Sequence, residues 1–371
     1  MNLARSSGAA ALAAASVLML LTPTSPARAT TESDYEPFDA KGFGESSMVV
    51  DNAWFPLVPG TQWTWQGTSI DDEGKQEDHT VVLTVTDLTK VIDGVRTVVC
   101  WEQDIVDGDL EESELAFFAQ ASDGSVWNFG EYPEEYDEGE IVATPGWIHA
   151  VKDGRAGIQM PAKPVLGSPS FAQGYAPSVP WTDRAQVYQT EQKTTVPSGS
   201  YEGVLVMDEF SHEEPGAYQL KYYAKGVGLV RVGYRGEVTD KEVLELVKRE
   251  QLDAAALAEV RATALAMEQR GFEQSPDVYA LTQPLQDREG KTLHSPQLQA
   301  KSAAPEPVRK ISDEQATEIA RATVQGEVMD IAVERKLGAK RLVVEVIADA
   351  DGAEIDVIID METGEVLGTE N

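Results

Sequence analysis

The chain has 371 residues and carries 63 acidic against 30 basic side chains, for a formal net charge of −33. This excess excludes nucleic acid as a partner, because nucleic-acid binding relies on lysine and arginine to displace counterions from phosphates. It also disfavours anionic lipid head groups, whereas divalent cations and basic partners are favoured. The length is sufficient for two or more domains.

Residues 1–29 are typical of a cleavable signal peptide. Arg5 supplies positive charge, residues 8–21 form a short apolar run, and Ala27 to Ala29 match a small-residue cleavage site. The apolar run is shorter than the roughly 20 residues that cross a bilayer, so we expect a secreted protein of the cell envelope or extracellular space, with no transmembrane anchor. Residues 30–49 are acidic, serine-rich and aperiodic, which predicts a flexible leader.

Residues 50–250 consist of short β-prone runs separated by turn sequences such as Asp107-Gly108 and Asp123-Gly124. Repeated strands and turns at this spacing predict a large, mostly antiparallel β domain, either a sandwich or a half-barrel. All the tryptophans fall in this region, where core packing is favoured over a ligand-binding face: Trp54, Trp63, Trp65, Trp101, Trp127, Trp147 and Trp181.

A helix and a linker are predicted after the β-rich region. Residues 241–250 are expected to close a hairpin with residues 228–235. The helix is predicted over 251–271, with Asp253 as its N-cap and Gly271 at its end. Residues 272–308 are rich in proline, glutamine, serine and alanine with few large apolar groups, which predicts an extended linker between independently moving domains.

Residues 309–371 predict a small domain with one helix packed on an antiparallel sheet. Ser312 to Gln315 form a capping box, and Ala316, Ile319 and Ala320 lie on one helical face. Alternating apolar residues in the rest of the segment predict the strands. Packing the helix on the sheet would bury the apolar face of each. The fold class is therefore α+β.

The C-terminal segment resembles a PepSY domain. The resemblance rests on Ile311-Ser312, Ala316, Ile319-Ala320, Val344 to Val346, Ile355 to Val357, and above all the Asp-x-x-Thr-Gly-Glu-Val signature at Asp360 to Val366. Such domains occur in propeptides of secreted metallopeptidases and are thought to bind or restrain peptidases. The resemblance thus implies a binding module without catalytic residues.

The β-rich region also resembles a group of uncharacterised secreted bacterial proteins. The matching segments are Trp54 to Gly60, Trp63 to Trp65, Phe118 to Gln120, Gly124 to Trp127, Phe129 to Glu131, Met160 to Ala162 and Tyr223 to Leu229. That group implies no activity.

The sequence contains no catalytic signature, so we predict no catalytic residue, no enzyme activity and no cofactor. A G-x-S-x-G or S-x-x-K motif is absent, and His79, His149, His212 and His294 are not spaced as a zinc site. Cys100 has no partner for a disulfide and is predicted to be buried and inert.

Two acidic runs, residues 104–114 and 131–140, are candidates for calcium, because hard cations need several oxygen ligands. The candidate ligands are Asp107, Asp109, Glu111, Glu134, Glu135 and Asp137. Solvated hairpin turns are the alternative, since neither run continues as a complete calcium loop.

These observations predict a secreted, non-catalytic binding protein. Its PepSY-like domain is expected to bind or restrain a peptidase or another extracellular protein. The alternative is binding of a small ligand or calcium by the β-rich domain, for which the tryptophans and acidic turns are the motivation.

Overall fold

The computed structural model describes residues 34–293, with gaps at 71–73, 138, 180, 213, 237 and 239–240, and residues 310–370, with gaps at 337–338, 349–351 and 362. The predicted signal peptide and the second half of the predicted linker lie outside these residues. The chain divides into two compact units, residues 1–295 and 296–371.

The first unit is built on one antiparallel sheet. Its strands are β1 (Thr61–Ile70), β2 (Gln76–Ile92), β3 (Val95–Val106), β4 (Asp109–Gln120), β5 (Val126–Asp137), β6 (Glu140–Ala143), β7 (Trp147–Ile148), β8 (Arg155–Met160), β9 (Phe171–Ala172), β10 (Gly174–Tyr175), β11 (Arg184–Val196), β12 (Gly199–Phe210), β13 (Ala217–Ala224), β14 (Gly228–Gly236) and β15 (Val243–Gln251). The main path runs β10-β8-β5-β4-β3-β2-β1-β15-β14-β13-β12-β11-β9.

Most neighbouring strands in this path are also neighbours in sequence, joined by tight turns. Asp93 and Gly94 both have positive φ, 45° and 79°, and Asp107 and Gly108 likewise have φ of 50° and 94°. Two successive residues with positive φ suit the two-residue hairpin turn whose twist matches that of the strands, and Asp-Gly is a favoured pair for it. The expected hairpin between β14 and β15 is also present, and β15 pairs with β1 on its other side.

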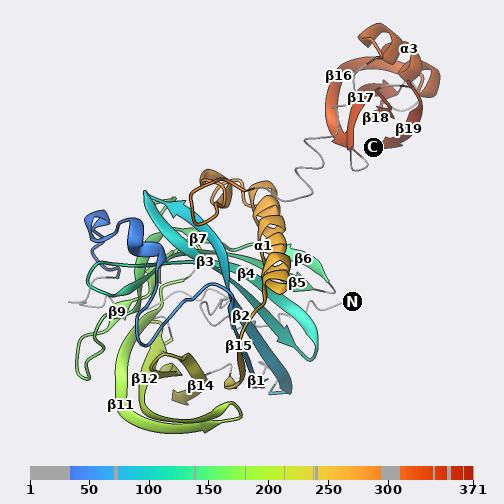
Figure 1. The fold of residues 1–371 in the computed structure, drawn as a ribbon. Helices are drawn as coiled ribbons and strands as arrows, with labels where there is room; N and C mark the ends of the chain where they lie inside the picture. The colour runs from blue at the N-terminus through green and yellow to red at the C-terminus, as the bar shows by residue number, and fades with distance from the viewer. Residues whose placement is uncertain are drawn as a thin grey trace, which may run out of the picture. The chain divides into compact units, whose positions relative to one another are not determined.

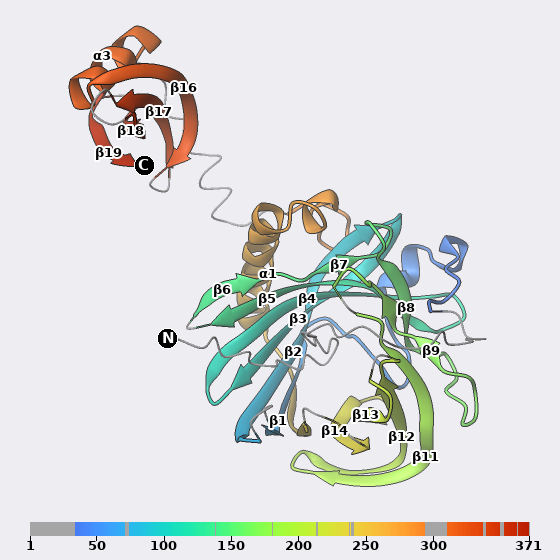
Figure 2. The same ribbon diagram turned by 180° about the vertical axis from the view of Figure 1, so that it is seen from behind.

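The sheet curves so that its inner face encloses one core and its outer face carries another (Figures 1 and 2). Residues alternate between the two along each strand. The inner core includes Trp63, Trp65, Val81, Val98, Cys100, Phe118, Met207, Tyr223, Val230 and Leu244. The outer core includes Leu88, Val99, Leu115, Phe117, Phe129, Tyr132, Leu265 and Tyr279. The predicted α+β class with a large antiparallel β domain is confirmed, and a single curved sheet forms it.

Helix α1 (Ala254–Gln274) lies across the outer face (Figure 1). Asp253 is its N-cap, as predicted, and accepts hydrogen bonds from the backbone N–H groups of Ala255 and Ala256. The helix continues past Gly271, contrary to the prediction that it ends there. Gly271 faces Tyr279, and a Cβ at this position would lie 2.7 Å from the Tyr279 ring, so the glycine permits close packing rather than a helix end.

The described part of the predicted linker is not extended. After α1 the chain forms η3 (Tyr279–Leu281), and Gln286 then pairs with Thr89 of β2 through two backbone hydrogen bonds of 2.8 Å. Tyr279 and Leu285 are buried in the outer core. The prediction of a linker over 272–293 is wrong, because these two large side chains anchor a segment whose composition is otherwise typical of one.

The predicted flexible leader is also packed on the sheet from residue 34 onward. It contains η1 (Ala40–Gly42) and η2 (Glu45–Met48). The Phe38 and Phe43 rings stack 5.5 Å apart and meet Trp127 and Phe129 edge-on. Burial of two aromatic rings outweighs the polar composition of the segment.

The second unit has helix α3 (Asp313–Thr323) on a sheet of β16 (Gly326–Lys336), β17 (Ala339–Ala348), β18 (Glu354–Ile359) and β19 (Val366–Glu370), in that order. The capping box is formed, with Ser312 and Gln315 each bonding the other's backbone N–H. Ala316 and Ala320 pack against Leu342, Val344, Val357 and Ile359 in a separate core. The predicted helix-on-sheet domain is confirmed.

Candidate functional site

Acidic side chains line part of the inner face of the large sheet. Along β3 and β4 the inward positions are apolar at one end and acidic at the other. The acidic positions on adjacent strands are Glu102 and Asp104 of β3, Glu112 and Glu114 of β4, and Glu131 of β5, each no more than 4% exposed. Glu102 lies directly opposite Glu114, and Asp104 opposite Glu112. The curvature of the sheet thus gathers these carboxyl groups away from water.

Further charged residues face this group from other strands. Lys221 of β13 forms an ion pair with Glu209 of β12, with 2.6 Å between Nζ and Oε2. His79 of β2 contacts Asp104 at 2.6 Å through Nε2 and Glu242 at 3.2 Å through Nδ1. We call this set the inner acidic cluster: His79, Glu102, Asp104, Glu112, Glu114, Glu131, Glu209, Lys221 and Glu242. It holds seven carboxyl groups and two basic side chains, so acidic groups outnumber basic ones.

The carboxyl groups of the cluster differ in how they are satisfied. Glu131 accepts hydrogen bonds from the Asn128 side chain at 2.6 Å and from the Trp147 indole at 3.2 Å. Neither oxygen of Glu114 has a hydrogen-bond partner, although the residue is 1% exposed. A buried polar group without a partner is unfavourable, so Glu114 is the least satisfied member.

Burial and neighbouring charges shift the pKa values of several groups in the cluster. Burial, assisted by neighbouring carboxylates, raises the pKa values of Glu112 and Glu114 well above the ordinary range. Burial raises the pKa of Glu131 to about 8 and that of Glu242 to about 7. Burial opposes the charged form of His79, but its hydrogen bond to Asp104 and the nearby carboxylates raise the His79 pKa overall. Several acidic groups therefore hold protons near neutral pH.

A cavity of about 40 Å³ adjoins the cluster within the inner core. Its walls are mainly aromatic and aliphatic, while Glu102 and Gln159 contribute polar groups: Phe55, Pro56, Leu57, Trp63, Trp65, Leu83, Glu102, Ala116, Phe118, Gln159, Tyr223, Gly228 and Leu229. The indole N–H groups of Trp63 and Trp65 donate to the carbonyls of Val227 and Leu229. These bonds fix two of the predicted core tryptophans beside the cavity.

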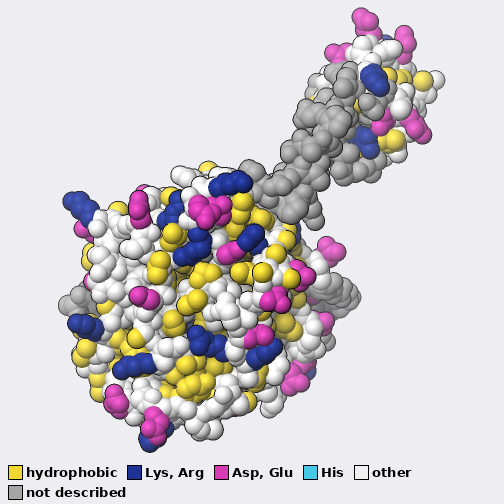
Figure 3. Space-filling model, viewed as in Figure 1, with side chains coloured by type: hydrophobic (Ala, Val, Ile, Leu, Met, Phe, Trp, Pro, Cys, Tyr) yellow, Lys and Arg dark blue, Asp and Glu magenta, His cyan; other side chains and the backbone are white. Residues whose placement is uncertain are grey.

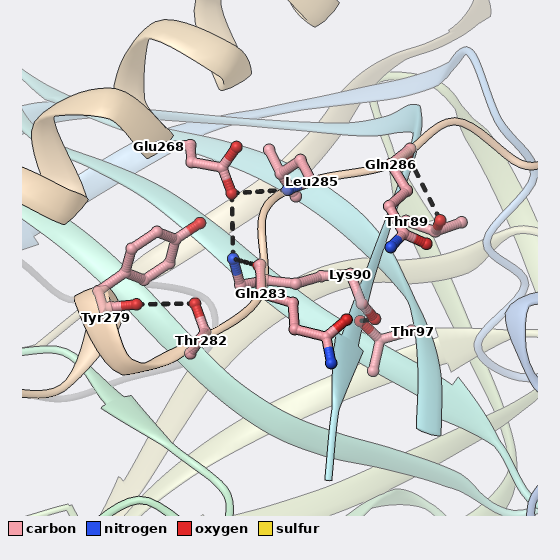
Figure 4. A network of polar contacts seen from close by, with 9 residues as sticks. All are labelled: Thr89, Lys90, Thr97, Glu268, Tyr279, Thr282, Gln283, Leu285 and Gln286. Carbon is pink, nitrogen blue, oxygen red and sulfur yellow. Dashed lines mark hydrogen bonds and ion pairs between the residues drawn. The ribbon is translucent and has the colours of Figure 1, made fainter. Parts of the chain in front are cut away.

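The outer face has a polar network of a different kind (Figure 4). Lys90 of β2 donates to Glu268 of α1 at 3.1 Å and to the carbonyl of Gln283 at 2.7 Å. Its ammonium group also lies 4.2 Å from the centre of the Tyr279 ring. Burial lowers the pKa of Lys90 to about 8, although Glu268 opposes the shift. Every one of these contacts joins the sheet to α1 or the segment after it, which indicates a structural role.

The predicted calcium ligands are not brought together. Asp107 accepts a hydrogen bond from Lys75 at the tip of the β3–β4 hairpin, Asp109 is exposed there, and Glu111 is half-buried on β4.

On β5 the other three candidates have different surroundings. Glu134 lies on the outer face and accepts hydrogen bonds from Nε and Nη2 of Arg270, at 2.8 and 2.6 Å. Glu135 lies opposite Glu112 in the β4–β5 register, at the margin of the cluster, and Asp137 is exposed. Within the described residues no group of three or more His, Cys, Asp or Glu side chains is placed to hold a metal ion.

The site residues predicted from the sequence do not include Glu102, Asp104, Glu112, Glu114 or Glu131, although four of these lie within or at the ends of the two acidic runs. A usable signal exists in the strands themselves. Acidic residues at 102 and 104, and again at 112 and 114, occupy positions of the same parity as the inward-facing Val98, Cys100 and Ala116. Acidic residues on the buried side of a strand are uncommon, and this marks them.

Cys100 is buried in the inner core, and burial, together with Glu102 and Glu114, raises its pKa. A raised thiol pKa lowers the thiolate fraction, consistent with the inert cysteine predicted from the sequence.

The C-terminal signature has a structural basis. Asp360 accepts hydrogen bonds from the backbone N–H and the hydroxyl of Thr363, both at 3.0 Å, and pairs with Arg341 at 2.9 Å. Gly364 has a φ of 76°, and a Cβ there would lie 3.1 Å from the side chain of Ile311. The Asp-x-x-Thr-Gly sequence therefore forms the turn that closes the sheet over the start of α3.

Residues 310–370 match the family model described as peptidase propeptide and YPEB domain, PepSY. This confirms the resemblance of the C-terminal segment, and it agrees with the exported location expected from the N-terminal residues. No curated protein matches the sequence. Within the described residues, the helices are too short or too polar to cross a membrane.

Two solved structures resemble part of the chain, and each aligns with 54% of it. One is a protein from Bacteroides fragilis NCTC 9343 inferred to be exported, with a YmcC-like fold, at 15% identity over 99% of its length and a TM-score of 0.32. The other is a protein from Parabacteroides distasonis ATCC 8503 inferred to be a lipoprotein, at 13% identity over 100% of its length and a TM-score of 0.29. TM-scores this low do not indicate a function for the chain.

Proposed function

We propose that this exported protein is a non-catalytic binding protein, and that its PepSY domain docks on a peptidase or another extracellular protein and restrains it. The observation that carries the proposal is the match of residues 310–370 to a peptidase-propeptide family. The turn that bears the signature residues is formed in the structure through Asp360, Thr363 and Gly364.

The domain has features suited to docking. It has its own core, formed between α3 and the sheet, and β16 and β19 lie at the two edges of that sheet. An edge strand offers backbone groups to a partner, and Met329 of β16 is 57% exposed. Acidic residues outnumber basic ones in residues 310–371, which favours approach to a basic surface.

The test is an inhibition assay with a purified metallopeptidase secreted by the same organism. The full chain should slow hydrolysis of a protein substrate and bind the peptidase in surface plasmon resonance, whereas a chain ending at residue 295 should do neither. Met329→Asp should weaken binding, because it places a charge on the exposed edge, while Glu318→Gln on α3 is the matched surface control. Equal inhibition by the full and shortened chains would contradict the proposal.

A further inference from the structure

The large sheet is open at one end, where β14 and β15 separate. β14 pairs with β15 at Leu244 and Glu245, whereas β1 stays paired with β15 as far as Gln251. The turn between β11 and β12 reaches this opening, because the Ser198 backbone N–H donates to the carbonyl of Leu246. Among the residues that the structure describes, the end of β15 therefore has a paired strand on one side only.

A groove of about 560 Å³ lies at this opening. It is lined by residues 247–251 of β15 and by Thr61, Ser198, Tyr201 and Val227. One water-sized sphere needs about 10–15 Å³ of such volume, so the groove can take a ligand much larger than a single ion. Five residues of a strand, at about 3.3 Å each, form a wall about 17 Å long. An elongated ligand would fit along this wall.

The backbone of β15 offers hydrogen-bonding groups on the side away from β1. The Leu252 N–H donates to the carbonyl of Gly60 at the start of β1. Bonded and non-bonded pairs alternate along an antiparallel ladder, so Glu250 also bonds to β1, whereas the N–H and C=O groups of Arg249 and Gln251 point away from it. An extended peptide added as a strand satisfies such groups.

Positive charge lies at the same wall. Arg249 is opposite Trp63 of β1, and its guanidinium carbon is 5.5 Å from the centre of the Trp63 ring. Arg249 has no acidic partner among the described residues, whereas Lys248 is paired with Glu250 at 2.5 Å. A strand along β15 would place a side chain opposite Arg249, where an opposite charge is favourable. The net charge of the whole chain has less influence, since salt screens charges beyond about 8 Å.

We propose that the end of β15 binds an extended peptide, which adds to the sheet as a further strand and places an acidic residue opposite Arg249. A small anion would meet the guanidinium but leave the N–H and C=O groups of Arg249 and Gln251 without partners. A basic peptide would be repelled by Arg249. The site belongs to the first unit, so it is separate from the docking proposed for the PepSY domain.

The test titrates the full chain with the pentapeptide acetyl-Thr-Val-Glu-Val-Thr-amide by isothermal titration calorimetry. N-methylation of the glutamate should weaken binding about 10-fold, because its N–H would face β15. N-methylation of the next valine, whose N–H would point away, is the matched control and should have a smaller effect. No binding, or equal binding of the two methylated peptides, would overturn the proposal and leave at most a site for the anionic group.

A peptide with glutamine in place of glutamate tests the charge. It should bind about 2- to 5-fold more weakly, because the pair with Arg249 is lost. Arg249→Gln should bind both peptides equally, while Lys163→Gln, at an exposed position of the same unit, should keep the difference. Circular dichroism verifies folding of the variants. Equal binding of the two peptides by the native chain would overturn the assignment of an acidic residue.

Amide hydrogen exchange followed by NMR locates the peptide on the native chain. With the peptide bound, the N–H groups of Arg249 and Gln251 should exchange about 10-fold more slowly or less, because they become hydrogen-bonded. The N–H of Glu250, which already bonds to β1, should change little. Unchanged exchange at Arg249 and Gln251 under saturating peptide would overturn the added-strand geometry.

Discussion

The two faces of the large sheet differ in how their acidic and basic side chains are paired. On the outer face, cations from the sheet and α1 meet acids one to one: Lys90 with Glu268, Arg270 with Glu134 and Arg261 with Asp87. On the inner face, seven carboxyl groups surround Lys221 and His79. On the outer face each pair joins the sheet to α1, whereas on the inner face carboxyl groups outnumber the basic side chains that they surround.

The solvent-exposed surface adds to this contrast. On the side that carries α1, acidic and basic side chains are interspersed and do not gather into one patch (Figure 3). The inner acidic cluster differs from this face in being buried, where a low dielectric strengthens its interactions.

The largest expected effect is on the outer face. Lys90→Met should destabilise the protein by about 3–5 kcal/mol, because it leaves Glu268 as a buried charge without its cation. Adding Glu268→Met should recover most of the loss. Urea unfolding measures both, and Lys193→Met, which removes a cation from an exposed pair, should change stability by less than about 1 kcal/mol. A decrease of less than about 1 kcal/mol in the unfolding free energy of Lys90→Met would contradict the structural role of the outer-face ion pair.

The next largest effect is expected in the pH dependence of stability, to which groups on the two faces contribute with opposite sign. The pKa values of Glu131 and Glu242 rise from an ordinary 4.5 to about 8 and about 7, so the folded chain binds more protons than the unfolded one between these values. The contribution of these groups is therefore fully present below pH 4.5 and decreases as the pH rises toward 8, by up to about 1.4 kcal/mol per pH unit for each group.

Lys90 acts in the other direction at higher pH. Its pKa falls from 10.5 to about 8, so the unfolded chain binds more protons between these values and stability should rise with pH there. Urea unfolding from pH 5 to 10 measures both limbs. Glu114→Gln should flatten the decrease below pH 8 and leave the rise above it, whereas Lys90→Met should remove the rise. A Glu114→Gln curve parallel to that of the native protein would contradict this.

A smaller effect is expected where α1 contacts η3. Gly271→Ala should destabilise the protein by about 1–2 kcal/mol, because overpacking against the buried Tyr279 ring outweighs the better helix propensity of alanine. Glu259→Ala, at an exposed position of the same helix, is the matched control and should be nearly neutral in thermal unfolding. Stabilisation by Gly271→Ala would mean that the contact with Tyr279 relaxes readily.

The smallest effect is expected at the start of α1. Asp253→Ala should cost about 1 kcal/mol, because two backbone N–H groups lose their acceptor. Asp253→Asn should restore most of this stability, since asparagine also caps helices. Thermal unfolding of the two variants checks the result, and equal losses in both would assign the effect to charge and not to the hydrogen bonds.

Local signals were sufficient for much of the fold. Asp-Gly turns, the alternation of apolar residues and the capping box at Ser312 act over a few residues, so they could be read in sequence and proved correct. The errors at residues 34–49 and 272–293 arose where a few large side chains, Phe38, Phe43, Tyr279 and Leu285, bury themselves in a core formed by distant strands. The composition of a segment is an average, so it does not show that a few large side chains are buried and hold the segment against the sheet.

The sequence by itself determined the class of the fold, the strand-rich region, the helix start at Asp253 and the PepSY domain, because each depends on neighbours along the chain. Only the tertiary structure decided which acidic residues are buried together in the inner acidic cluster. Glu102, Glu114 and Glu131 come from three strands and become a cluster when the sheet curves, while Glu134, three residues from Glu131, is turned to the opposite face and paired with Arg270. Charge is visible in a sequence, but its burial and its partners are set by contacts between distant residues.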